Sequence, residues 1–146
     1  FLENLADLNK LSNEKNIKVL TNVHGSHKDC ISNLKKIFPS ISFECKKIDK
    51  MIKKTFVTIS YSSSVIEDSI NSKVPVILFD KWKRYKHCDV NMNNNFFLIF
   101  YVNNVEELFE KFEFIKNNYS KLDFKSLIIG KDTNNNIKDL FKKLEK

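Results

Sequence analysis

The chain has 146 residues, of which 42% are hydrophobic and 29% are charged, a composition typical of one globular domain. A chain of this length buries roughly 68–70% of the surface that it exposes when unfolded, so it can form a core without disulfides. No apolar run reaches the roughly 20 residues of a membrane-spanning helix, and the sequence contains no recognisable signal peptide. The net charge of +7 suits an anionic partner, either nucleic acid, an anionic membrane surface or a phosphorylated small molecule.

Motif content narrows these candidates. The sequence contains no RNP, helix-turn-helix or zinc-finger motif, so we expect no nucleic acid partner. Cys30, Cys45 and Cys88 are odd in number and form no CxxC, which predicts reduced thiols and a cytoplasmic protein. His24 and His27 form an HxxH pair, but no cysteine or acidic cluster completes a ligand set. We therefore expect no metal and no other cofactor.

Hydrophobic periodicity predicts alternating helices and strands along the chain. The predicted helices cover residues 1–14, 28–38, 48–54, 64–72 and 105–115, with a last one marked by Ile137, Leu140, Phe141 and Leu144. The predicted strands cover residues 17–23, 41–45, 56–60, 74–79 and 96–102. In the second helix we expect Ile31, Leu34, Ile37 and Phe38 on the buried face, and Pro39 should end it.

This order predicts an α/β fold with one Rossmann-like parallel sheet and helices on both of its faces. In an open parallel sheet, ligands bind outside the carboxyl ends of the strands. Four loops leave those ends, at residues 24–27, 46–47, 61–64 and 80–89, and they carry many basic and hydroxyl side chains. The sequence therefore predicts an anion site at this edge.

A run of three serines, Ser62, Ser63 and Ser64, stands between a predicted strand and a predicted helix. The unpaired N–H groups of a helix start attract phosphate, and serine hydroxyls add donors. Alternatively, Ser64 and Glu67 form a capping box, and the two roles are compatible. Asp68 could accept hydrogen bonds from a ribose diol, or it could be a solvated acid that favours the helix dipole.

The loop "DKWKRYKHCD" at residues 80–89 combines four cations, including Arg84, with Trp82 and Tyr85. These cations could attract a nucleotide diphosphate or an anionic acceptor, and the aromatic rings could stack on a base or sugar. The alternatives are a solvated loop whose aromatic rings pack on the core, and a single-stranded nucleic acid site. A thiol nucleophile at Cys88 beside His87 is a further alternative, although nothing in the sequence orients that pair.

The stretch "YSSSVIEDSINSKVPVILFD" resembles the donor-binding half of GT-B glycosyltransferases, above all the polyol-phosphate and capsule polymer transferases. It is also similar to the non-hydrolysing UDP-N-acetylglucosamine 2-epimerases. Asp68 stands seven residues before Pro75, the spacing of the family's ribose-binding acid. "IKVLTNVHG" and "FFLIFYVNNVEELFEKFEFI" look like further family segments, so the resemblance covers residues 15–118.

The resemblance implies that residues 1–146 are one donor-binding domain, half of a GT-B architecture, that binds a nucleotide-sugar or nucleotide-polyol donor for cell-surface polysaccharide synthesis. The three serines would contact the diphosphate, Asp68 or Glu67 the ribose, and His24 the phosphates or sugar. The catalytic residues remain unassigned. An epimerase-like isomerase and a non-catalytic nucleotide-binding module are the alternative functions.

The sequence also departs from the family pattern. "SKVP" replaces "GKP", and Gly25 rather than proline follows the histidine. The family domain opens with a strand before its first helix, whereas this sequence opens at the helix with Phe1, so we expect a piece of a longer protein. The acceptor-binding domain is absent, and the piece should be inactive alone. A basic surface would also suit peripheral contact with the inner face of the cell membrane.

Overall fold

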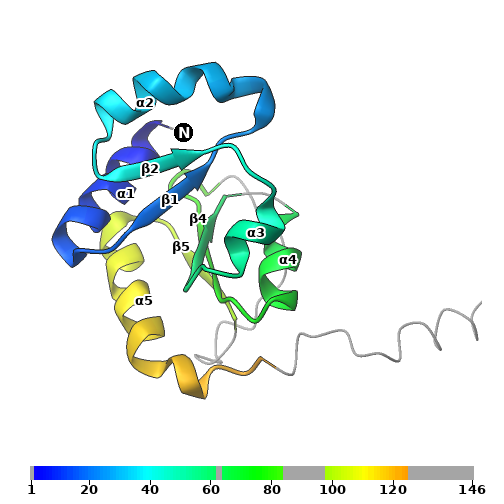
Figure 1. Ribbon diagram of the computed structural model, residues 1–146. Helices are drawn as coiled ribbons and strands as arrows, with labels where there is room; N and C mark the ends of the chain where they lie inside the picture. Colours follow the sequence, from blue (N-terminus) through cyan, green and yellow to red (C-terminus); the bar gives the residue numbers. More distant parts are fainter. Residues whose placement is uncertain (1, 62–63, 84–97, 125–146) are drawn as a thin grey trace, which may run out of the picture.

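The computed structural model describes residues 2–61, 64–83 and 98–124, which form an alternating α/β structure (Figure 1). The α-helices are α1 (Leu2–Lys15), α2 (Ile31–Ile37), α3 (Ile48–Ile52), α4 (Val65–Asn71) and α5 (Val105–Asn118), and the 3₁₀ helices are η1 (Gly25–Cys30) and η2 (Tyr119–Lys121). The strands are β1 (Val19–Asn22), β2 (Ile41–Glu44), β3 (Thr58–Ser60), β4 (Val76–Phe79) and β5 (Ile99–Val102). The predicted element order is confirmed through residue 118, and the predicted last helix lies outside the described residues.

The strands of the described residues pair only in parallel, as predicted, but they form two sheets rather than one. One sheet has the order β1-β2, with Val19 opposite Ile41. The other has the order β3-β4-β5, with Val76 between Thr58 and Ile99. The prediction of one continuous sheet is therefore wrong for the described part of the chain, whereas the prediction of a mixed α/β fold with parallel strands is confirmed.

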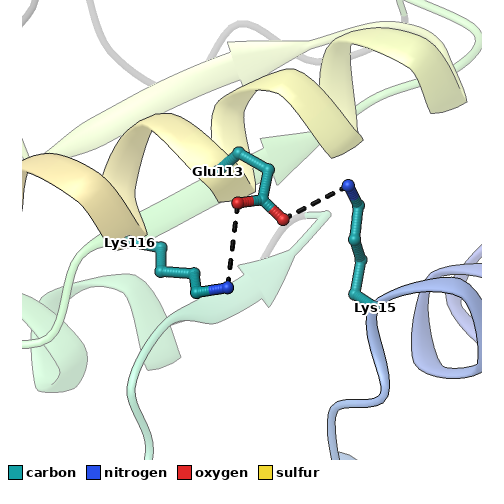
Figure 2. Close-up of polar contacts among 3 residues, drawn as sticks. All are labelled: Lys15, Glu113 and Lys116. Atoms are coloured by element: carbon teal, nitrogen blue, oxygen red, sulfur yellow. Dashed lines mark ion pairs between the residues drawn. The ribbon is translucent and has the colours of Figure 1, made fainter.

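Helix α1 connects the two sheets because its buried leucines lie in two different cores. Leu5 belongs to a smaller core beneath β1 and β2, and Leu11 belongs to the larger core of β4, β5 and α5. Both leucines are at most 2% exposed. One ion pair joins α1 to α5, since Glu113 of α5 lies 3.2 Å from Lys15, and Glu113 also lies 3.8 Å from Lys116 of its own helix (Figure 2). Such partly exposed pairs contribute about 0–1 kcal/mol each, so apolar burial dominates.

Strand β4 is the centre of the larger core, as its continuous apolar sequence predicted. All four of its residues are at most 1% exposed, which is typical of a parallel strand that is covered on both faces. Ser69 of α4 is also fully buried, and its hydroxyl donates to the Val65 carbonyl at 2.7 Å and lies 2.9 Å from the Thr58 hydroxyl. These bonds satisfy a polar group that would otherwise destabilise the interior.

Two local predictions are wrong. Residues 25–30 form a 3₁₀ helix, so α2 begins only at Ile31, and Ile37 is 61% exposed instead of buried. Leu34 is the buried residue of this short helix. Phe38 follows the helix with a non-helical φ of −124°, and its side chain packs in the same core as Leu34.

The capping box that was the alternative role of Ser64 does not form, because Ser64 has helical dihedrals (φ −57°, ψ −15°) and its side chain makes no cap bond. A cap residue needs non-helical dihedrals to bring its side-chain oxygen to the next turn. A comparable reciprocal arrangement is present at α5 instead. There Asn104 accepts from the Glu107 amide at 2.7 Å, and Glu107 accepts from the Asn103 amide at 2.8 Å.

Candidate functional site

The loops predicted to carry the site do follow the carboxyl ends of the parallel strands. His24 comes two residues after β1, Lys46 two residues after β2, and Ser64 four residues after β3. Asp80 follows β4 directly. The 13 residues between β2 and β3 include α3, which is the kind of crossover that parallel strands require.

His24 is exposed, and its imidazole is used locally. Its Nδ1 accepts a hydrogen bond from the Ser26 amide at 3.3 Å and lies 2.8 Å from the Ser26 hydroxyl, so His24 caps the 3₁₀ helix η1. Because these bonds engage Nδ1, the Nε2 atom is the ring nitrogen left to meet a ligand. If His24 contacts a phosphate or sugar as predicted, it does so through Nε2.

Three predicted site residues lie together at the start of α4. Ser64, Glu67 and Asp68 are all exposed, and their side chains make no hydrogen bond or ion pair with any described residue. The backbone carbonyl of Ser64 accepts from the amides of Glu67 (3.1 Å) and Asp68 (3.4 Å), which closes the first turn. Both acids are exposed at the helix start. This fits either of the two alternatives for Asp68, whereas Glu67 does not take part in the capping box that was its alternative role. Ser62, Ser63 and Arg84 lie outside the described residues.

The described part of the basic loop, residues 80–83, is anchored on the protein. Asp80 is 3% exposed, and its carbonyl accepts from the Lys83 amide. Lys81 forms a 3.0 Å ion pair with Asp7 of α1, and the hydrogen bond to that carboxylate raises the pKa of Lys81 above its ordinary value. Trp82 is 57% exposed, which leaves much of its indole accessible for stacking on a ligand.

A groove of about 1190 Å³ lies between the two sheets. Its walls include the residues of β1 and two of the three residues of β3, and its apolar floor includes Met51, Phe79 and Phe112. Near the carboxyl ends of the strands it is lined by Asn22, Glu44, Lys46, Ser60 and Tyr61. Sequence reasoning placed Lys46 and Tyr61 at this edge of the sheet but missed the other three.

The groove is rich in cations. Its lining includes Lys18, Lys46, Lys50, Lys54 and Lys116, and Glu44 is the only carboxylate among the described residues that line it. Lys46 lies 2.7 Å from Glu44, and this hydrogen bond lowers the pKa of the Glu44 carboxyl. The Lys46 amide also donates to the Asn22 side chain at 3.1 Å, which joins the ends of β1 and β2.

The structure does not bring the predicted residues into this groove. None of His24, Ser64, Glu67 or Asp68 lines it. His24 follows the two-stranded sheet, whereas the other three belong to the helix after β3, so the predicted site is divided between the two sheets. Of the missed groove residues, Asn22 had a signal in the sequence, because the two-residue period of 17–23 places it on the same face as Leu20.

No protein-family model, curated protein or solved structure matches the chain. Within the described ranges, no cluster of three or more histidine, cysteine or acidic side chains could hold a metal ion. In the same part of the chain, no helix has both the length and the apolar character to cross a membrane.

Proposed function

We propose that this chain is the donor-binding part of a glycosyltransferase or polyol-phosphate transferase, and that it binds a nucleotide-diphosphate-activated donor. One observation carries the proposal. Ser64, Glu67 and Asp68 share the first turn of a helix that follows a parallel strand, and all three side chains are exposed and without a described partner. Hydroxyl, N–H and carboxylate groups at such a position suit a phosphorylated ribose.

The proposed roles follow from the chemistry of each group. The backbone N–H groups at the start of α4 and the Ser64 hydroxyl would donate to the diphosphate, together with Ser62 and Ser63. Asp68 or Glu67 would accept from the ribose hydroxyls, and Nε2 of His24 would contact the phosphates or the sugar. Donors fixed in this way stabilise a leaving diphosphate as charge develops on it, which is how such a site accelerates transfer.

Other parts of the proposal extend beyond these residues. Arg84 and the cations after β4 would attract the donor, and the acceptor would be bound by a separate domain. The product would be a cell-surface polysaccharide made on the cytoplasmic side of the membrane, with the basic surface contacting anionic lipids. Turnover would then require the acceptor-binding part, whereas donor binding would not.

The test is a thermal-shift titration with UDP, CDP, GDP and inorganic phosphate. A ligand at 100 times its Kd stabilises the folded state by about 2.7 kcal/mol, which raises the melting temperature measurably. We expect one nucleoside diphosphate to stabilise the protein and a Ser63→Ala/Ser64→Ala variant to lose that effect. Ser32→Ala, on the exposed side of α2, is the matched control and should respond like the unmodified protein.

A second variant separates ribose recognition from phosphate recognition. Asp68→Asn should weaken binding of the ribonucleotide but not of its 2′,3′-dideoxy analogue, because only the first has a diol. Equal losses for both nucleotides would remove Asp68 from the proposed role. Stabilisation by no nucleotide, in a protein shown to be folded, would contradict donor binding by this chain.

A further inference from the structure

The groove between the two sheets is bounded by two strand edges. In the described part of the chain, β1 pairs only with β2, and β3 pairs only with β4. Residues of both strands line the groove along their length, from Ile17 to Asn22 and from Thr55 to Tyr61, except Thr58. The two edges therefore line a common groove.

The hydrogen bonds of these strands identify the backbone groups that face the groove. The Val23 amide donates to the Glu44 carbonyl of the neighbouring strand, and the Thr58 amide donates to the Pro75 carbonyl. Because backbone direction alternates along a strand, the intervening residues direct their N–H and C=O groups to the opposite side. Leu20, Asn22 and Ile59 are such residues, and all three line the groove.

Burial along the strands also indicates an unfilled position. Every residue of β3 is only partly buried, although its neighbour β4 is completely buried. Leu20 of β1 and Phe56, two residues before β3, line the groove and are 36% and 42% exposed, so two large apolar side chains are left open to it. An apolar occupant between β1 and β3 would cover these surfaces.

We propose that this groove receives one further β-strand, carried on the amino side of α1 and parallel to β1 and β3. The described strands would then form one sheet in the order β2-β1-new-β3-β4-β5. This is the 3-2-1-4-5-6 order of the doubly wound fold, in which the first strand is central and is followed by the first helix. The inference concerns the assembly of the sheet and is independent of the proposed donor site.

The position of α1 indicates that the strand in the groove would be the one directly before this helix in the chain. Asn4, Leu5 and Leu8 of α1 line the groove, so the first half of the helix lies beside the proposed position. A strand in that position, followed by α1 and β1, is a β-α-β unit, the usual connection between neighbouring parallel strands. The groove cations also favour a strand that is apolar at its centre and has acidic residues at its ends.

Amide hydrogen exchange, read residue by residue by NMR, tests the proposal. The probe is the chain extended at its amino end by seven residues rich in Val and Ile and then by a short Gly-Ser-Asp turn. In the extended chain we expect exchange at Leu20, Asn22 and Ile59 to slow by at least about 100-fold, because these amides would gain strand partners. Exchange at Thr58 and Val23, which already have partners, should change much less.

Two controls make the result specific. An extension of the same length with two central prolines cannot supply the N–H groups of a strand and should give no protection. Leu20→Asp, at a position exposed in the unextended chain, should fold but should reduce the protection that the apolar extension provides.

Two results would overturn the proposal. The first is unchanged exchange at all three amides in a folded, extended chain. The second is strong protection of the same amides without any extension, since another segment or a second copy would then occupy the groove. Sizing chromatography distinguishes these occupants, because a second copy would double the mass.

Discussion

Replacing Ile59 or Ile77 with alanine measures how far β3 is covered. The two isoleucines are register partners on neighbouring strands, Ile59 in β3 and Ile77 in β4. Ile77 is 0% exposed in the larger core, whereas Ile59 is partly buried and lines the groove. The same side chain is therefore truncated beside a packed interior in one variant and beside an open groove in the other.

The expected magnitudes follow from burial. Truncation to alanine removes hydrocarbon equivalent to about three CH₂ groups, or about 2.4 kcal/mol when it is all buried. At Ile77 a cavity cost adds to this transfer cost, so we expect a loss of about 3–4 kcal/mol. At Ile59 part of the side chain already contacts water and no closed cavity forms, so about 1 kcal/mol is expected.

Urea unfolding followed by circular dichroism gives both values, provided that the denaturant dependence m is the same in each variant. The difference between the two losses should be about 2–3 kcal/mol. Equal losses would refute the reasoning, because they would mean that β3 is covered on its groove side as fully as β4 is covered by its neighbours.

Three further predictions concern local packing and pH. Ser69→Ala should lower the free energy of unfolding by about 1–2 kcal/mol in urea titrations, because two hydrogen bonds of a buried side chain are lost, and no change would contradict the bonding described. Leu34→Ala should lower the free energy of unfolding by about 2–5 kcal/mol, and Ile37→Ala should lower it by less than about 0.5 kcal/mol, because only Leu34 is buried. A larger loss for Ile37→Ala than for Leu34→Ala would mean that Ile37 is buried after all. The lowered pKa of Glu44 stabilises the fold above pH 4.5, the ordinary value, and this contribution is lost as pH falls through the folded-state pKa. Lys46→Gln should therefore be less stable than the unmodified protein at neutral pH but not at pH 2–3, and a gap that persists in acid would exclude this ion pair as its cause.

Local sequence features predicted most of the described elements because their causes are local. The four consecutive apolar residues of β4 specify a strand that is buried on both faces, and they are buried as expected. The apolar spacing of α1 and α5 specifies which side of each helix packs. Leu11 and Leu108, for example, are both 0% exposed.

The division into two sheets could not be predicted from local pattern, because it depends on which strand edges meet. A strand at the edge of a sheet, such as β3, and a strand with neighbours on both sides can have similar β-branched sequences. The sequence of the strand alone therefore does not show whether a neighbour pairs with each of its edges. The Ser64 cap failed for a related reason. Its residue type suits a cap, but the backbone dihedrals of the turn decide whether the side chain can reach an amide, and sequence does not specify those dihedrals.

The central claim is that the start of α4 and the loop after β1 bind one nucleoside diphosphate. The most direct measurement is a two-dimensional NMR titration of the isotope-labelled chain, with and without the amino-terminal strand extension, against UDP, CDP and GDP. We predict that one nucleotide shifts the amide signals of Ser64, Asp68 and His24 together, with a single Kd. Signals that stay unchanged in both proteins, or that shift only away from these residues, would contradict the claim.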